Sequence, residues 1–444
     1  MASLSTQSYK GTRDYYPEDK RIQTYIFDTW RSVAESYGYE EYGAPLLEPL
    51  DIYAAKSGTE LVHDQTYTFT DRSDRSVAIR PEMTPSLARM IAARRQELPF
   101  PARLYSIANF MRYERPQRGR EREFWQMNID LVGVDSSRAD AEIIALAHKS
   151  LMAFGATEDM FTIKVNNRGL INYIMTQYLG LDVIQSQLMI KLFDRKNKIS
   201  AEEFRDQALE IFGSDNGHAG LVKIAALLEA KSLGDLPAVL KECPAIEEIQ
   251  ELLTHLSQMK ITNVVFDSTL MRGLDYYTSM VFEVFDTHTD NRRALFGGGR
   301  YNGLVGLFGV EDAPCVGMGL GATTVEQFLE LHDLLPENAS TTEVYLIPLG
   351  NDMATKASEV ADTMRDEGVN VEVDISERKL DRQIKTAIKK AIPFIVFVGK
   401  EEADSEIYTL KDTRTATEEK IGMSRLISIV KDQRRSAIDE FDIF

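Results

Sequence analysis

The chain is poor in cysteine and has no long apolar run, and each shortage excludes a class of protein. Cys243 and Cys315 are the only cysteines among its 444 residues. Two cysteines cannot build a framework of disulfides and are typical of a reducing compartment. No run of about 18 apolar residues occurs, and the first residues lack an apolar signal segment. We therefore expect a cytoplasmic protein with no membrane partner.

Recognisable metal-binding spacings are also missing. The chain contains no HExxH sequence and no pair of CxxC sequences, and its six histidines are scattered. Zinc sites that stabilise a fold use closely spaced cysteines and histidines. The sequence therefore predicts no structural metal held by the protein itself.

Positive charge is in short supply. The chain has 51 lysines and arginines against 69 aspartates and glutamates, which gives a net charge of −18. An acidic protein does not attract nucleic acid through its overall field, so any RNA contact must use local basic patches. The length and a hydrophobic content of 43% predict two or three globular domains.

The most informative stretch, residues 104–134, is typical of two β-strands joined by a charged turn. Polar residues and one aromatic residue alternate with apolar residues on the second strand; they are Phe124, Gln126, Asn128 and Asp130. Because side chains alternate along a strand, these four share one face. Arg112 and Glu114 have the same parity on the first strand. Matching register would gather an arginine, carboxylates, a glutamine and an aromatic ring in one patch.

Two interpretations of this hairpin are open. The commoner one is a solvated face of an antiparallel sheet, with the arginines at the tip as ordinary surface charge. The ring of Phe124 among polar groups favours a site for a phosphate and a flat base. A planar guanidinium suits phosphate oxygens, and the phenyl ring could lie on the base.

Three motifs carry a resemblance to a known family. Arg112-Tyr-Glu114, a charged loop and Phe124-Trp-Gln126 resemble motif 2 of class II aminoacyl-tRNA synthetases, and the loop resembles that of the histidyl-tRNA synthetases. The sequence RGLDYY at 272–277 matches a histidine-specific motif of that family. The stretch FGGGRYNG at 296–303 resembles the second such motif, with Asn302 where the family usually has aspartate.

The resemblance implies an α+β fold. It implies an antiparallel β-sheet catalytic domain of class II type, flanked by helices and formed by residues 1–168 and 259–330. Residues 169–258 have helical periodicity and are expected to form an insertion, and 331–342 a linker. Alternating strands and helices in 343–444 predict an α/β domain with a mixed sheet, similar to an anticodon-binding domain. The helix, strand and proline near residue 45 resemble motif 1, which implies a homodimer.

The implied reaction has two steps: ATP and L-histidine form histidyl-adenylate, and histidine is then transferred to tRNA-His. Arg112 and Arg272 are the expected catalytic residues, acting with Mg²⁺ on phosphate charge. The residues expected to bind ATP are Arg112, Glu114, Arg120, Phe124 and Arg272. Those expected to bind histidine are Glu82, Thr84, Arg112, Gln126, Asp130, Arg272, Tyr276, Tyr277 and Tyr301. Gln117 and Arg118 are expected at the acceptor end of the tRNA.

Thr84 has two interpretations, and Thr324 departs from the pattern of the family. Thr84 precedes a helix predicted from residue 85, so capping is its first interpretation, and the α-amino contact comes from the resemblance. Thr324 stands where motif 3 normally has an arginine, and no lysine or arginine occurs from 301 to 355. The main alternative is a non-catalytic, histidine-binding regulatory paralogue. Another class IIa synthetase and a generic RNA-binding protein are weaker alternatives.

Overall fold

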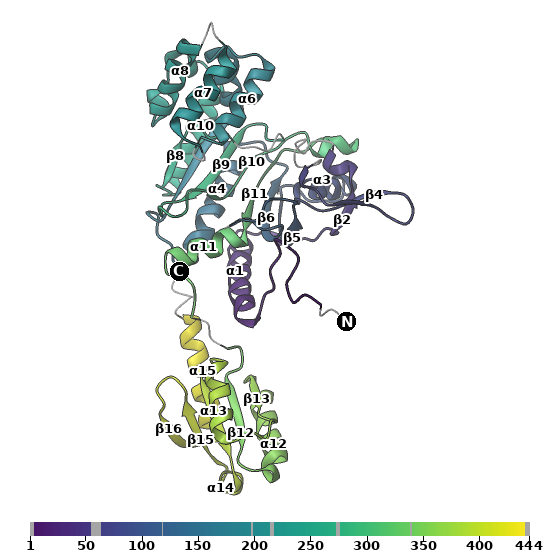
Figure 1. Ribbon diagram of the computed structural model, residues 1–444, viewed down its shortest axis with the longest axis vertical. Helices are drawn as coiled ribbons and strands as arrows, with labels where there is room; N and C mark the ends of the chain where they lie inside the picture. Colours follow the sequence, from purple (N-terminus) through teal and green to yellow (C-terminus); the bar gives the residue numbers. More distant parts are fainter. Residues whose placement is uncertain are drawn as a thin grey trace. The chain divides into compact units, whose positions relative to one another are not determined.

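The protein forms two compact units, Met1–Leu335 and Pro336–Phe444, in this computed structural model (Figure 1). The structure describes residues 4–54, 64–117, 119–196, 199–213, 217–271, 276–337 and 340–439. None of the helices in these ranges combines the length and apolar character that crossing a membrane requires.

An eight-stranded mixed sheet is the centre of the first unit. Its order is β1 (Glu40–Glu41), β5 (Ala102–Met111), β6 (Glu123–Val132), β11 (Cys315–Gly321), β10 (Ala294–Arg300), β9 (Met280–Asp286), β7 (Phe161–Asn167) and β8 (Val264–Phe266). The pairings from β5 to β7 are antiparallel, as predicted, whereas the edge strands β1 and β8 run parallel to their neighbours. The expected α+β class is therefore confirmed.

Three helices cover one face of this sheet (Figure 1): α1 (Pro17–Ser36), α4 (Ser137–Met152) and α11 (Ala322–Leu331). The apolar side chains of β6 enter the same core, with Met127 and Ile129 fully buried beside Trp30 of α1 and Phe328 of α11. Burying one large apolar side chain contributes about 1.5–3 kcal/mol. The residues that alternate with these along β6, most of them polar, therefore face away from this core.

A smaller three-stranded sheet contains β2 (Leu47–Pro49), β4 (Ser76–Ile79) and β3 (Thr68–Thr70), in that order. The short α2 (Asp51–Ala54) and α3 (Thr84–Ala93) lie next to it in the chain. The predicted capping role of Thr84 is wrong. The cap position of α3 is Met83, which has helical backbone angles and no side-chain cap. The buried turn before the helix continues directly into it, so Thr84 starts the first turn and is itself buried.

The described residues of the range predicted as an insertion form helices and the turns that connect them, without a strand. This range contains α5 (Arg168–Tyr173), a π-helix (Ile174–Tyr178), α6 (Val183–Asp194), α7 (Ala201–Phe212), α8 (Gly217–Glu229), a 3₁₀ turn (Leu233–Asp235), α9 (Ala238–Lys241) and α10 (Ala245–Gln258). Asp182 and Ser200 cap α6 and α7 by accepting backbone N–H bonds. Phe193 and Phe204 pack edge to face at 5.4 Å. The boundaries predicted for this insertion stay a prediction.

The second unit is an α/β domain built on a five-stranded mixed sheet. Its order is β13 (Val371–Val373), β12 (Val344–Pro348), β14 (Phe394–Val398), β15 (Ile407–Asp412) and β16 (Glu418–Gly422). The first three strands are parallel and the last two antiparallel. α12 (Ala354–Asp366) and α15 (Met423–Asp439) pack on one face, and α13 (Leu380–Lys389) on the other. The short α14 (Lys400–Ser405) precedes β15.

Candidate active site

On the face of the large sheet that α1, α4 and α11 do not cover, glycines of β11 leave the backbone without side chains. Gly317 lies directly opposite Asp130, and Gly319 opposite Asn128. A Cβ at Gly317 would lie 2.1 Å from Asp130 Oδ1, and one at Gly319 would lie 2.5 Å from Gln126 Nε2. These glycines are required because any side chain there would displace the polar groups of β6.

Five of the residues predicted to bind histidine lie together on this face. The hydroxyl of Tyr301 donates to Asp130 Oδ1 at 2.5 Å, and that of Tyr276 donates to Glu82 Oε2 at 3.2 Å. The ring of Tyr276 lies 5.0 Å from that of Tyr277 and 5.8 Å from that of Tyr301, between centroids. Two carboxylates therefore lie with three aromatic rings, two of which belong to the consecutive residues Tyr276 and Tyr277.

Asp130 is the most unusual group of this cluster. Its side chain is 2% exposed, and Oδ2 has no hydrogen-bond partner among the described residues. Burial raises the pKa of Asp130 to about 7, and the hydrogen bond from Tyr301 opposes that rise. A buried carboxylate with a free oxygen is stabilised by a ligand that presents an N–H group.

The hairpin has the register that the alternation predicts. Phe110 pairs with Phe124, and the backbone N–H of Arg112 donates to the carbonyl of Arg122 at 2.8 Å, which extends the ladder. The guanidinium of Arg112 lies 5.3 Å from the Phe124 ring centroid. Nε of Arg112 donates to the carbonyl of Pro81 at 2.9 Å. An arginine and an aromatic ring are thus held side by side, as expected for a phosphate and a base.

The end of the hairpin carries a second cation. Arg120 Nε lies 2.7 Å from Glu114 Oε2, so two of the five residues predicted to bind ATP form an ion pair. Arg293 donates to the side-chain oxygen of Gln117 at 2.8 Å and links the tip to the β9–β10 connection. Arg118 and Arg272 lie outside the described residues, so their predicted roles stay predictions.

Thr324, at the motif 3 position, turns away from this group. Its hydroxyl donates to the carbonyls of Leu295 at 2.6 Å and Gly321 at 2.9 Å, and so joins α11 to the adjacent strands. Within the described part of the site, Arg112 lies beside the predicted base-stacking ring of Phe124, and Arg120 is paired with Glu114.

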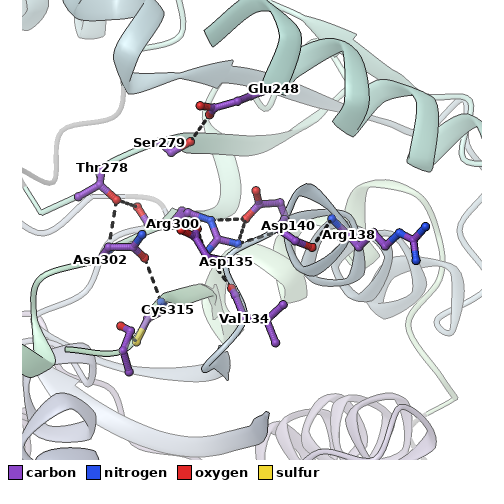
Figure 2. Close-up of polar contacts among 12 residues, drawn as sticks. Val134, Asp135, Arg138, Asp140, Glu248, Thr278, Ser279, Arg300, Asn302 and Cys315 are labelled. Atoms are coloured by element: carbon purple, nitrogen blue, oxygen red, sulfur yellow. Dashed lines mark hydrogen bonds and ion pairs between the residues drawn. The ribbon is translucent and has the colours of Figure 1, made fainter. Parts of the chain in front are cut away.

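A buried arginine that the motif analysis did not single out holds the end of β10 (Figure 2). Arg300 is 3% exposed, and its Nε donates to Asp140 Oδ1 at 3.0 Å. Its Nη1 and Nη2 donate to the carbonyls of Val134 at 2.9 Å and Ser136 at 3.1 Å. Burial raises the pKa of Asp140 to about 6, although the charge of Arg300 opposes the rise. The network ties the start of α4 to the residue just before Tyr301.

Asn302 continues this network on the other side of Tyr301 (Figure 2). Its Oδ1 accepts from the backbone N–H of Cys315 at 3.1 Å, and its own N–H donates to Thr278 Oγ1 at 3.1 Å. An amide oxygen accepts a hydrogen bond as a carboxylate does. The asparagine therefore supplies the acceptor that the usual aspartate of the family would supply.

Two cavities among the described residues lie away from the predicted site residues. One of about 720 Å³ lies between the start of α4 and α10, where Arg138, Glu247, Glu251 and His255 contribute charge of both signs. One of about 510 Å³ lies further along α10, beside Cys243. Across the described ranges, no three histidine, cysteine, aspartate or glutamate side chains cluster as metal ligands. The absence of a structural metal stays a prediction.

Comparison with known proteins gives a consistent result over both units. A family model described as histidyl-tRNA synthetase matches residues 11–325, and one described as an anticodon binding domain matches residues 343–433. The histidine–tRNA ligase of Leptospira biflexa is 39% identical over 431 residues, which cover 97% of this chain and 98% of the relative. That of Thermoplasma volcanium is 33% identical and covers 96% and 99%.

Solved structures share the fold. Histidyl-tRNA synthetase from Nostoc sp. PCC 7120 superposes with a TM-score of 0.82 at 24% identity, over 97% of this chain and 100% of that one. A protein from Bacillus halodurans, described as an ATP phosphoribosyltransferase regulatory subunit/histidyl-tRNA synthetase, has a TM-score of 0.72 at 21% identity and covers 90% and 100%. At these identities the likeness concerns the fold alone.

Proposed function

The chain belongs to the histidyl-tRNA synthetase family, and we propose that it forms histidyl-adenylate from ATP and L-histidine and then transfers histidine to tRNA-His. The observation that carries this proposal is the buried carboxylate of Asp130, with one oxygen bonded to Tyr301 and the other free. Imidazole supplies the N–H that the free oxygen lacks. A site built on such a bond rejects side chains without it, because the carboxylate would be left unsatisfied.

The histidine subsite divides into two ends. Asp130 and Tyr277 contact the two ring nitrogens, while Tyr276 and Tyr301 enclose the ring. Glu82, Thr84 and Gln126 hold the α-amino group, with the carboxylate of Glu82 as its charge partner. Gln126 donates its amide to Asn128 at 2.8 Å, so its carbonyl oxygen is the atom it offers to the ammonium.

The nucleotide lies along the hairpin. The attack of the histidine carboxylate builds negative charge on the α-phosphate, and Arg112 stabilises that charge from a fixed position. Phe124 stacks on the adenine ring, and Glu114 accepts from its amino group. Arg120, now paired with Glu114, contacts the terminal phosphates. Arg272 remains the second expected catalytic arginine.

We propose that Mg²⁺ enters the site bound to ATP. Mg²⁺ usually keeps several waters and combines substrate phosphates with one or two carboxylates. An ion that brings most of its own ligands with the nucleotide does not require a dedicated set of protein carboxylates. When bound, Mg²⁺ neutralises charge on the leaving pyrophosphate.

The tRNA contacts come from both units. Gln117 and Arg118 meet the acceptor end at the hairpin tip. In the second unit, α13 exposes a row of cations that form no ion pair in the described ranges; they are Lys379, Arg382, Lys385 and Lys389. Such a local patch can bind phosphate although the whole chain is acidic. It is the surface we assign to the anticodon end of the tRNA.

A homodimer and a cytoplasmic location complete the proposal. Leu46, Leu47 and Phe69, on or beside the small three-stranded sheet, are 43%, 47% and 46% exposed. Neighbouring large apolar side chains on a surface are typical of a protein interface. Sedimentation of the full-length protein tests the dimer, and the variant L47E, which places a charge in this apolar surface, should shift it toward monomer.

One experiment separates this function from its alternatives. Pyrophosphate exchange is measured with each of the twenty amino acids in turn, and then charging of bulk tRNA. We expect exchange with histidine alone and one charged tRNA species. Histidine binding without exchange would support the regulatory paralogue, and exchange with another amino acid would support a different class IIa synthetase. Two relatives that match over nearly the whole chain are named histidine–tRNA ligase, which does not favour the paralogue.

A further inference from the structure

A sharp turn interrupts the hairpin at the point where it carries two residues of the proposed nucleotide site. The backbone N–H of Glu114 donates to the carbonyl of Arg112 at 2.8 Å, which closes a three-residue turn around Tyr113. The paired residues of β5 and β6 end before this turn, and one further bond follows, from the N–H of Arg112 to the carbonyl of Arg122 at 2.8 Å. The carbonyl of Glu114 therefore needs a donor from outside the ladder.

The side chain of Arg122 supplies that donor. Its Nε donates to the carbonyl of Glu114 at 3.1 Å, and its Nη1 donates to the hydroxyl of Tyr9 at 3.0 Å. The guanidinium lies 4.0 Å from the ring centroid of Tyr113 and 5.5 Å from that of Tyr9. Arg122 is 9% exposed, so water reaches little of it. A planar guanidinium donates in its plane while its faces stack on rings, which a lysine cannot do.

The N-terminal segment also contacts Arg122 through its backbone. The carbonyl of Gly11 accepts from the backbone N–H of Arg122 at 2.6 Å. A Cβ at Gly11 would lie 2.7 Å from Cγ of Arg122 and 2.9 Å from Cγ of Pro116, and the φ of 89° lies in the left-handed region. Only glycine lets the segment pass this close in this conformation. A segment distant in the sequence thus fixes the arginine that holds Glu114.

We propose that Arg122, held by the N-terminal segment, is a positioning residue that fixes Glu114 to accept from the amino group of adenine. The inference rests on the proposed function, which assigns that contact to Glu114, and goes beyond it by giving Arg122 and the N-terminal segment a role. Arg112 depends less on this arrangement, because its own Nε is bonded to the carbonyl of Pro81 at 2.9 Å. Arg122 therefore acts on recognition of the base.

The test compares two nucleotides by histidine-dependent pyrophosphate exchange with the full-length protein. They are ATP and purine riboside 5′-triphosphate, whose base has no amino group for Glu114 to bind. R122A should raise the KM for ATP about 10-fold, the effect of one hydrogen bond. The KM for the analogue should stay within about twofold, because the analogue never used that bond. A purely structural loss would reduce the amount of active protein and leave both KM values unchanged.

Two further variants keep the test decisive if R122A does not fold. Y9F removes only the acceptor of Nη1, at a residue that is 53% exposed, and should raise the KM for ATP about threefold without changing that for the analogue. R122K keeps the charge but loses the planar fork, so it should behave like R122A.

The matched control is R103A. Arg103 lies on β5 of the same hairpin, but its guanidinium donates to the two carboxylate oxygens of Glu142 on α4, at 2.8 and 2.9 Å. R103A should leave the preference for ATP over the analogue unchanged. Equal increases in KM for both nucleotides in R122A, or a KM for ATP that none of the variants at positions 9 and 122 changes, would overturn the inference.

Calorimetric titration with each nucleotide separates this inference from the proposed function. If the wild-type protein supports no exchange, the proposed catalysis fails, while a preference for binding ATP that R122A loses still supports the inference. If the wild-type protein catalyses exchange with a preference for ATP that R122A and Y9F retain, only the inference fails. A wild-type protein without that preference would overturn both the contact of Glu114 with the amino group and the inference.

Discussion

The hydroxyl of Tyr301 donates to Oδ1 of Asp130 at 2.5 Å, although 171 positions separate the two residues in the chain. This bond joins the end of β10 to the middle of β6 and leaves the second oxygen of Asp130 for a ligand. The same carboxylate is buried, and its pKa is raised to about 7. Several measurable properties of the protein follow from that combination.

The first prediction concerns histidine affinity and pH. Because the pKa of Asp130 is about 7, the carboxylate becomes ionised, and able to accept from imidazole, as the pH rises through that value. Histidine binding should therefore tighten across this range, measured by calorimetry. In D130N the tightening due to this group should disappear, and any remaining change reports the titration of the ligand. An identical pH profile in D130N would contradict the assignment.

The second prediction concerns stability and pH. The pKa of Asp130 lies above its ordinary value of 3.8, so the folded protein binds more protons than the unfolded chain between the two values. The free energy of unfolding should thus fall as the pH rises from about 4 to about 7. In D130N, the decrease in the free energy of unfolding that is due to Asp130 should be absent. That decrease is roughly 4 kcal/mol at most. Urea unfolding at both ends of the range measures it; parallel curves for the two proteins would argue against a buried ionisable group.

The third prediction concerns the Arg300 network. R300A leaves the Asp140 carboxylate buried without its charge partner, which should reduce the free energy of unfolding by about 3–5 kcal/mol. Adding D140L removes that carboxylate and should restore part of the loss. Urea unfolding of the single and double variants gives the coupling. Additive losses would mean that the two side chains do not interact.

The fourth prediction concerns the ion pair at the hairpin. Arg120 is 53% exposed at its side chain, so its pair with Glu114 contributes little to stability, about 0–1 kcal/mol. R120A should raise the KM for ATP and leave the unfolding midpoint unchanged. R75A is the matched control, because Arg75 is an exposed arginine paired with Asp71 in the β3–β4 turn. If R75A raised the KM for ATP equally, the effect would come from overall charge.

The fifth prediction concerns α13. The double variant K385E/K389E should weaken tRNA charging severalfold while histidine-dependent pyrophosphate exchange stays normal, because exchange needs only the proposed active site in the first unit whereas charging also needs tRNA bound to the second. Raising the salt concentration should weaken wild-type charging more than charging by this variant, since fewer phosphate contacts remain. K356E reverses an exposed lysine on α12 of the same unit and should have little effect. Equal losses in K356E would exclude a specific surface.

The hairpin could be predicted from the sequence because alternation fixes which side chains share a face of a strand. The register was conditional at that point, and the structure supplies it by pairing Phe110 with Phe124. Glu82, Asp130 and Tyr301 could be predicted as partners only through the family resemblance, because no local pattern brings distant segments together. The structure places these three in one cluster.

The remaining features depend on tertiary contacts. Arg300 belongs to a recognised motif, but its buried partner Asp140 lies on a helix whose sequence indicates only an amphipathic helix. Thr84 is not the cap residue of α3, because the turn before the helix is buried and the backbone is already helical at Met83. Local sequence rules do not include these neighbours.

The most direct test is a crystal structure of the protein with L-histidine bound. We expect the imidazole over Gly317 and Gly319, with one ring nitrogen within hydrogen-bonding distance of the free oxygen of Asp130 and the α-amino group at Glu82. Histidine bound elsewhere, or a ring that points away from Asp130 with that oxygen still unpaired, would contradict it.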